Sequence, residues 1–411
     1  MKNSFKKDPY PGRPKILFVG LAESSHTHSW IELLNQSALN VRLFALPSGL
    51  PPKDWKVRTY ITHYGVGELD PETHASLYPP NRIGKLYKKC LTHLFSGGIK
   101  DPGPPKWLAQ IIRRWQPDVI HTLGIEPASS FYMDVCDTFG LFGIGKWVVQ
   151  VRGGPDLALL RLVPNFVDRL RKVVSQCDQL LADNKQNYEY AQSLGFIRTH
   201  SFPLGVVPGT GGVDVSRLAQ SWSGLPSKRK RLILWPKAYE CPQSKALPVF
   251  EAIRLAWEKI RPCEIHMLAT IPETEMWYWT LPEEIRRCCH MRERIPREQV
   301  LNLMVQARVM LGPSLSDGTP NAMLEAMAAG AFPIVSPLET IRSVVDDERH
   351  VLFARNLYPQ EIADALTRAM SDDDLVDQAA ERNLELVGKI ADRAKIRPRV
   401  VEFYERLAKE R

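Results

Sequence analysis

The sequence predicts an α/β protein with two Rossmann-like, doubly wound domains in tandem. Its 411 residues exceed what a single hydrophobic core usually serves. Short, β-branched apolar runs alternate with segments of helical period, which is the pattern of parallel strands covered by helices. The alternation stops at a Gly- and Pro-rich stretch, Phe202–Asp214, and then begins again. We therefore expect two separate parallel sheets.

In the first half, the apolar run Lys15–Gly20 ends in Gly, which is typical of a buried parallel strand. Runs of the same kind predict further strands at Val41–Ala45, Asp118–His121, Trp147–Val151 and Leu180–Ala182. Segments of helical period predict helices at Trp30–Leu39, Trp107–Trp115 and Phe166–Ser175.

The second half repeats this rhythm. Strands are predicted at Leu232–Trp235, Glu264–Ala269, Arg308–Leu311 and Phe332–Val335, and helices at Leu247–Lys259, Arg297–Gln306 and Pro320–Ala329. The remaining pattern is helical, at Glu361–Met370, Leu375–Val387 and Val400–Lys409. We divide the chain into domains of residues 1–207 and 208–389 and a terminal helix of residues 390–411.

Charge is distributed unevenly along the chain. Residues 1–207 contain 25 Lys and Arg against 17 Asp and Glu, whereas residues 208–411 contain 29 of each, so the first half carries the whole net charge of +8. This asymmetry indicates different partners for the two halves, one of them anionic, such as a membrane surface or a phosphorylated substrate. The basic residues lack the helix or aromatic-strand pattern of nucleic-acid readers, so we expect no nucleic-acid partner.

The seven cysteines show no metal-ligand spacing, which predicts reduced thiols and a cytoplasmic protein. The N-terminal residues fit neither a signal peptide nor a transit peptide. No run reaches the roughly 18 apolar residues of a membrane-spanning helix. The acidic run Ser371–Asp374 is interpreted as the start of a helix and not as a metal site.

The loop after Leu311 is the richest candidate for chemistry, because ligands of open α/β sheets bind beyond the carboxyl ends of the strands. It reads GPSLSDGTPNAMLEAMAAG. Thr319 is the expected N-cap of a helix, and Pro320 occupies the first helical position that proline favours. The amides of Asn321 and Ala322 would then project from a helix N-terminus, which favours anions and a diphosphate in particular.

Glu325 is the single acid in this otherwise apolar helix. A helix that is apolar on all sides is buried, and a buried carboxylate is costly unless it is paired or hydrogen-bonded. Sugar hydroxyls would be suitable partners; the alternatives are that Glu325 faces solvent or a structural Arg. Asp317 precedes Gly318, and its alternative role is that of a turn former.

The segment SDGTPNAMLEAMAAGAFPIV resembles the E-x7-E signature of the family-4 retaining glycosyltransferases, the glycosyl transferases group 1. The resemblance covers essentially the whole chain, weakly before Val207 and clearly after Lys230. It implies the GT-B fold, in which two Rossmann-like domains face a cleft and the last helix crosses back to the first domain. Enzymes of this fold generally need no metal to bridge the diphosphate, so we expect no metal cofactor.

Carried over by position, the resemblance implies that Glu325 binds the nucleotide ribose and that Asp317 contacts hydroxyls of the donor sugar. Asp317 replaces the usual Glu and is one methylene shorter. The donor-binding residues between the two acids would be Gly318, Thr319, Asn321 and Ala322.

The family also places an Arg and a Lys after the first strand of the second domain, where they neutralise the leaving diphosphate. Lys237 and Lys245 take these positions, in a loop that is three residues longer. Both could stabilise a departing phosphate, although Lys lacks the bidentate fork of Arg; the alternative is a solvated surface lysine. The resemblance places Arg294 near the nucleobase.

In the first domain, KILFVGLAESSHTHSW resembles the family's first strand and glycine loop. This implies that Gly20 approaches the donor phosphate and that His26 and His28 contact the acceptor. Arg152 stands where many relatives carry a His beside the reacting centre. It either replaces that His as a cation or marks altered or lost activity. The loop pattern is otherwise kept by Gly153, Gly154 and Asp156.

The resemblance thus implies a retaining hexosyltransferase that moves a sugar from a UDP- or GDP-sugar to a glycan or lipid-linked acceptor, in cell-surface polysaccharide or glycoconjugate synthesis. Alternatives are a nucleotide-sugar epimerase or phosphorylase, and a catalytically degenerate nucleotide-binding protein. Asn81–Phe95 has the pattern of a basic amphipathic helix. That helix either has a solvated face or docks on anionic lipid at the inner face of the cytoplasmic membrane.

Overall fold

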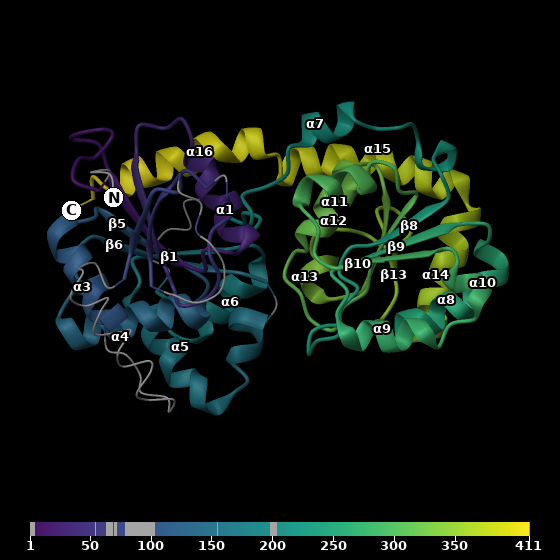
Figure 1. The fold of residues 1–411 in the computed structure, drawn as a ribbon, viewed down its shortest axis with the longest axis horizontal. Helices are drawn as coiled ribbons and strands as arrows, with labels where there is room; N and C mark the ends of the chain where they lie inside the picture. Colours follow the sequence, from purple (N-terminus) through teal and green to yellow (C-terminus); the bar gives the residue numbers. More distant parts are fainter. Residues whose placement is uncertain are drawn as a thin grey trace. The chain divides into compact units, whose positions relative to one another are not determined.

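The computed structural model describes residues 5–53, 55–62, 69, 72–78, 103–153, 155–197 and 204–410. The chain divides into two compact units (Figure 1). The first consists of residues 1–152, 156–211 and 397–411, and the second of residues 153–155 and 212–396. Each unit contains a parallel sheet with helices, which confirms the predicted α/β fold class.

In the described part of the first unit, one parallel sheet has the strand order β4-β3-β2-β1-β5-β6-β7. The strands are β1 (Lys15–Gly20), β2 (Asn40–Ala45), β3 (Arg58–Ile61), β4 (Ala75–Leu77), β5 (Val119–Leu123), β6 (Lys146–Val151) and β7 (Gln179–Ala182). β1 pairs with β2 on one side and with β5 on the other. The strand order therefore reverses at β1, and ligands of such sheets bind beyond the carboxyl ends at this point.

Helices cover both faces of this sheet: α1 (Ser25–Ile31), α3 (Gly103–Trp115), α4 (Ser130–Phe139), α5 (Pro164–Gln176), α6 (Lys185–Ser193) and α16 (Arg393–Leu407). Successive side chains of β1 point to opposite faces, as in any strand. Leu17 and Val19 join the core cluster that contains Leu108 of α3. On the other face, Phe18 packs edge-on against Tyr404 of α16, with the ring centroids 6.0 Å apart.

The last helix, α16, packs in the first unit through residues 397–411, as the resemblance implied. Its Tyr404 hydroxyl accepts a hydrogen bond from Trp30 Nε1 at 3.0 Å. The same hydroxyl lies 2.5 Å from Nδ1 of His121, a buried residue of β5. Tyr404 therefore ties the end of the chain to α1 and to the central sheet.

In the second unit, the sheet has the order β10-β9-β8-β11-β12-β13. Its strands are β8 (Leu232–Trp235), β9 (Glu264–Leu268), β10 (Cys289–Arg292), β11 (Val309–Gly312), β12 (Phe332–Val335) and β13 (Leu352–Phe353). One core cluster lies on each face of the sheet. The helices are α7 (Val215–Gln220), α8 (Leu247–Ile260), α9 (Pro272–Trp279), α10 (Glu283–Arg286), α11 (Arg297–Met304), α12 (Asn321–Ala328), α13 (Glu339–Arg342), α14 (Pro359–Ser371) and α15 (Asp373–Ile390).

Several predicted helix starts are wrong: α16 begins at Arg393 and not at Val400, and α3 begins at Gly103 and not at Trp107. Two further starts concern candidate site residues. Helix α1 begins at Ser25 and not at Trp30, because no proline or glycine breaks the polar stretch before the apolar residues. His26 and His28 consequently lie in a helix and not in a loop. Helix α12 begins at Asn321, with Pro320 in an extended conformation as its N-cap, so the expected cap at Thr319 is one residue early.

Three sequence predictions fall on residues outside the described ones: the basic helix Asn81–Phe95, Gly154, and the start of the linker at Phe202. None of the described helices is both long and apolar enough to span a bilayer.

Candidate functional site

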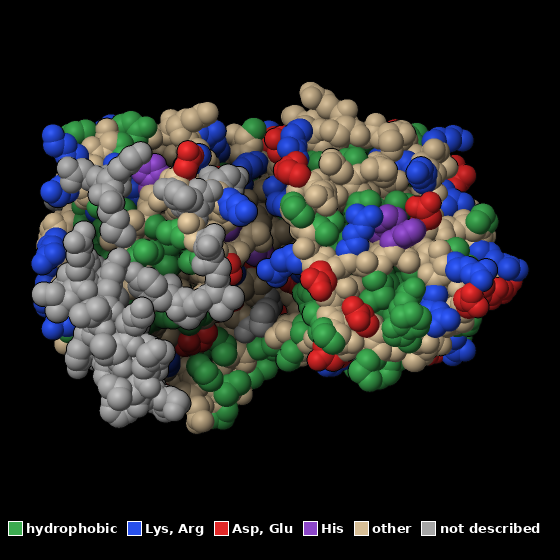
Figure 2. All heavy atoms as spheres, in the orientation of Figure 1, with side chains coloured by type: hydrophobic (Ala, Val, Ile, Leu, Met, Phe, Trp, Pro, Cys, Tyr) green, Lys and Arg blue, Asp and Glu red, His purple; other side chains and the backbone are tan. Residues whose placement is uncertain are grey.

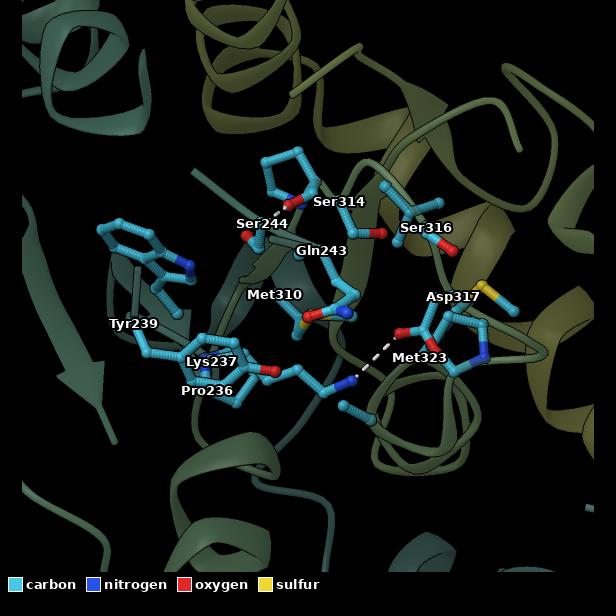
Figure 3. A pocket seen from close by; sticks show the side chains of 16 residues that line it. Pro236, Lys237, Tyr239, Gln243, Ser244, Met310, Ser314, Ser316, Asp317 and Met323 are labelled. Carbon is cyan, nitrogen blue, oxygen red and sulfur yellow. Dashed lines mark hydrogen bonds and ion pairs between the residues drawn. The ribbon is translucent and has the colours of Figure 1, made fainter. Parts of the chain in front are cut away.

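A pocket lies at the carboxyl ends of β8 and β11 in the second unit (Figure 3). It has an empty volume of about 470 Å³, including open solvent. Its walls come from the loop after β8, the loop after β11 and the first turn of α12. The lining residues include Trp235, Lys237, Tyr239, Gln243, Ser244, Gly312, Ser314, Asp317, Pro320, Ala322 and Met323.

Lys237 and Asp317 meet across this pocket (Figure 3). Lys237 Nζ donates to Asp317 Oδ2 at 3.0 Å, and the other carboxylate oxygen accepts from the amide of Gly318 at 2.9 Å. Asp317 therefore forms the expected D-G turn and also holds a cation. The Asp317 carboxylate raises the pKa of Lys237, so this lysine stays charged at neutral pH.

Lys245, the second predicted cation, is held differently. Its ammonium pairs with Glu240 at 2.9 Å. Its backbone N–H donates to Asn356 Oδ1 at 2.9 Å, and Asn356 Nδ2 donates to the carbonyls of Lys245 and Pro313. Asn356, which is buried, thus fastens the loop after β8 to the loop after β11. The pocket lining includes Ser244 but not Lys245.

The N-terminal turn of α12 borders the same pocket through Pro320 and Ala322. The first amides of a helix lack intrahelical partners and give this end a partial positive charge. Thr319, in the turn before the helix, is 5% exposed. Lys237 and the start of α12 therefore give one pocket two sources of positive potential.

Glu325 is buried in α12 and pairs with an arginine. Nε and Nη2 of Arg297, the first residue of α11, both donate to Glu325 Oε1, at 3.0 and 2.5 Å. One oxygen of Glu325 therefore faces a structural Arg, which was one of the alternatives that the sequence left open. Glu325 Oε2 accepts no hydrogen bond from the described residues. Glu325 itself does not line the pocket.

Arg294 lies in the exposed loop before α11. Its charge acts on Tyr239, an aromatic residue of the pocket wall that sequence analysis did not single out. Burial raises the pKa of Tyr239, and Lys237 and Arg294 oppose this rise. Arg294 is thus near the pocket, and Tyr239 adds an aromatic face to it.

In the first unit, Gly20 ends β1 and packs closely against β5, where a Cβ atom would lie 3.1 Å from Leu123 Cβ. His28 is hydrogen-bonded to the carbonyl of Ala22, and its ring packs on Trp55 with the centroids 4.7 Å apart. His28 is thus part of the local packing of α1, whose first turn also contains His26.

Arg152 follows β6 and lies in a partly buried polar cluster. Its Nε and Nη2 donate to Gln150 Oε1 at 3.2 and 3.0 Å, and its backbone N–H donates to Asp156 Oδ2 at 3.0 Å. Asp156 also accepts from the amide of Ile125. Burial lowers the pKa of Arg152 to about 10 and raises that of Asp156 to about 6.

His121 on β5 belongs to the same surroundings, although sequence analysis did not identify it. Burial and the nearby Arg152 hold its pKa well below the ordinary value, so the ring is neutral. Arg152 is therefore a cation at the carboxyl end of β6 whose neighbours are a neutral imidazole and a carboxyl group.

Comparison with known proteins agrees with this architecture. Residues 238–372 match the family model of glycosyl transferases group 1. No curated protein matches the chain in sequence.

Solved structures resemble the chain over nearly its whole length. HepE of Anabaena in complex with UDP-glucose has 11% identity and a TM-score of 0.66, with 95% of this chain and 98% of that chain covered. Sucrose-phosphate synthase of Thermosynechococcus elongatus has 14% identity and a TM-score of 0.67, with 97% and 100% covered. An E. coli trehalose-6-phosphate protein bound to UDP-2-fluoro glucose has 13% identity and a TM-score of 0.62, with 95% and 99% covered. These likenesses establish the GT-B fold.

Proposed function

We propose that the protein is a retaining glycosyltransferase with a UDP- or GDP-sugar as donor, because residues 238–372 match the family model of glycosyl transferases group 1 and the chain has the GT-B fold. The observation that carries this proposal is the pocket at β8 and β11, where a lysine and a helix N-terminus converge on a space lined by Asp317. A nucleotide diphosphate is the anion that suits two such groups.

The nucleotide would bind in the second unit. Its diphosphate would lie between Lys237 and the first turn of α12, and its ribose would reach Glu325, which Arg297 holds in one orientation. Tyr239 and Arg294 would contact the base. Complexes of the similar HepE and E. coli proteins contain UDP-glucose and UDP-2-fluoro glucose, which supports a uridine nucleotide as the first donor to try.

In the proposed reaction, the acceptor hydroxyl attacks the anomeric carbon of the donor sugar. The bond from that carbon to the diphosphate oxygen breaks on the same face, and the acceptor proton passes to the leaving phosphate. Lys237, Lys245 and the α12 amides would stabilise the charge that grows on the diphosphate, an electrostatic contribution from groups already in position. Asp317 would orient both Lys237 and a sugar hydroxyl. No metal ion is required in this scheme.

The acceptor would bind to the first unit, where His26, His28 and Arg152 are the proposed contacts. The excess of positive charge in residues 1–207 suits a phosphorylated or lipid-linked acceptor at an anionic surface. We therefore place the enzyme in cell-surface polysaccharide or glycoconjugate synthesis, in the cytoplasm and peripherally on the membrane.

Binding and turnover of nucleotide-sugars test the proposal. The wild type is titrated with UDP, GDP and ADP, and consumption of the matching sugar donors is followed in the presence of acceptor lipid extracts. Glu325→Ala is expected to weaken nucleotide binding about 100-fold, and Asp317→Ala to lower turnover by about 10²–10³, the usual effect of removing one stabilising group.

Glu251→Ala is the matched control, because Glu251 is also a helical glutamate paired with an arginine, Arg254. It is expected to behave like the wild type. If Glu325→Ala and Asp317→Ala also behave like the wild type, the site assignment is wrong. If nucleotides bind but no donor is consumed, the degenerate, non-catalytic alternative replaces the proposal.

A further inference from the structure

Three side chains that the proposed reaction does not use converge at the edge of the second sheet. Glu264 and His266 are two residues apart on β9 and therefore project from the same face. His290 on the edge strand β10 is the direct register partner of His266. Their ligand atoms all lie within 4.8 Å of one another. Figure 2 shows histidine side chains beside acidic and basic ones over these strands.

His266 is the unusual member of this cluster. It is only 8% exposed, and neither ring nitrogen has a hydrogen-bond partner among the described residues. Its Nε2 lies 3.5 Å from Glu264 Oε2, and its ring centroid lies 4.6 Å from that of His290. Buried polar groups nearly always have partners. The His266 imidazole lies beside two other potential metal ligands, and a bound ion would be such a partner.

We propose that Glu264, His266 and His290 bind one zinc ion. Two imidazoles and a carboxylate are typical zinc ligands, whereas magnesium and calcium prefer sites made of oxygen atoms. Ligands of one zinc ion stand about 2.0–2.1 Å from it, so no two are more than about 4.2 Å apart. The exposed Glu264 and His290 side chains would rotate toward the ion to reach this spacing.

The zinc site is separate from the donor pocket. None of its three residues lines that pocket, and Glu264 begins β9, whereas the pocket lies beyond the carboxyl ends of the strands. The ion would join the short edge strand β10 to its neighbour β9, and a water molecule would take its fourth position. This inference therefore does not depend on the proposed transferase activity.

One nearby charge opposes the binding of a cation. Arg292 lies two residues beyond His290 on β10 and acts electrostatically on His266. Its side chain is exposed and can turn toward solvent when an ion binds. Arg292→Gln is therefore expected to bind zinc several-fold more tightly than the wild type.

The test is a calorimetric titration of chelator-treated full-length protein with Zn²⁺, together with the visible spectrum of its Co²⁺ form. One equivalent is expected to bind to the wild type and to raise its melting temperature. Glu264→Gln and His290→Ala carry the decisive result, since both residues are exposed: each is expected to weaken binding at least about tenfold, by analogy with the 10–100-fold loss on removal of an outer-shell partner.

Controls distinguish this site from other ligands of zinc. His74→Ala removes an exposed histidine elsewhere, and Cys288→Ser removes the nearest partly exposed thiol; both are expected to keep wild-type affinity. UDP binding is measured in every variant and is expected to stay unchanged. The proposal is overturned if the wild type binds no zinc, if binding persists in the His266→Ala/His290→Ala double variant, or if Cys288→Ser abolishes it.

Discussion

Each of the two oxygens of the Asp317 carboxylate has its own hydrogen-bond partner. Oδ1 accepts from the Gly318 amide, whereas Oδ2 accepts from Lys237. An asparagine at this position can still close the turn through its amide oxygen, but it carries no negative charge for the lysine. The charge and the turn can therefore be tested apart.

Asp317→Asn is expected to fold like the wild type and to lower donor turnover by about 10²-fold, because Lys237 loses its orienting partner at the leaving group. Lys237→Met should have an effect of similar size. Turnover is measured with saturating donor, and the melting temperature is recorded alongside. Full activity in Asp317→Asn would show that Asp317 acts only as a turn former.

Asp156 provides a pH-dependent contribution to stability. Burial raises its pKa to about 6 from an ordinary 3.8, so between these values the folded state binds the proton and the unfolded state does not. The contribution of Asp156 to the free energy of unfolding therefore falls as pH rises from about 4 to 6. From pH 4 to pH 7 this loss amounts to at most about 3 kcal/mol.

The substitution Asp156→Asn removes this titration. The stability of the wild type relative to Asp156→Asn is expected to be greater at pH 4 than at pH 7, as measured by urea unfolding at several pH values. A difference that is independent of pH, or larger at pH 7, would contradict the raised pKa of Asp156.

The proposed site residues that lie within a single loop or helix could be identified from the sequence. Asp317 and Glu325 lie in one contiguous segment, and Lys237 follows the first strand of its sheet. Arg297, Glu240 and Asn356 were missed, because their roles depend on contacts with partners distant in sequence or on a loop path that no local pattern encodes. The sequence contains two local hints of these residues: Glu240 lies between Lys237 and Lys245, and Arg297 is at the start of the predicted helix Arg297–Gln306.

Among the elements, α16 offers the sharpest test. Tyr404 is buried, and its hydroxyl contacts both Trp30 and His121. Tyr404→Phe keeps the ring but leaves two buried polar groups without this partner, which is expected to lower the free energy of unfolding by about 2–4 kcal/mol. Glu402→Gln, at an exposed position of the same helix, is the control and is expected to keep wild-type stability. A loss of less than about 0.5 kcal/mol, which is the usual effect of a surface substitution, would show that the hydroxyl contributes little to stability.

The long apolar strands and amphipathic helices were predictable because their hydrophobic period reports burial directly. The strands that were missed are β3, β4, β10 and β13, which are short and lie near the edges of their sheets. Polar residues such as Arg58 in β3 and His290 in β10 interrupt the apolar runs by which strands were identified. Their pairing is set by the neighbouring strand and not by their own composition.

The described residues of the two units form separate hydrophobic cores. One core cluster contains residues from the first unit only, and the other two clusters contain residues from the second. A ligand of one unit should therefore stabilise that unit directly, and a destabilising substitution in the other unit should act on a different part of the unfolding profile.

Calorimetry with and without nucleotide tests this division. UDP at 100 times its dissociation constant is expected to stabilise the second unit by about 2.7 kcal/mol, and so to move one unfolding transition upward. Tyr404→Phe is expected to move a different transition downward, because Tyr404 lies in the first unit. In the variant, UDP should still produce its full shift. If the protein shows a single transition that both UDP and Tyr404→Phe displace, the two units unfold together. If there are two transitions and UDP displaces the same one as Tyr404→Phe, the nucleotide binds to the first unit. In that case the assignment of the donor pocket to β8 and β11 is wrong.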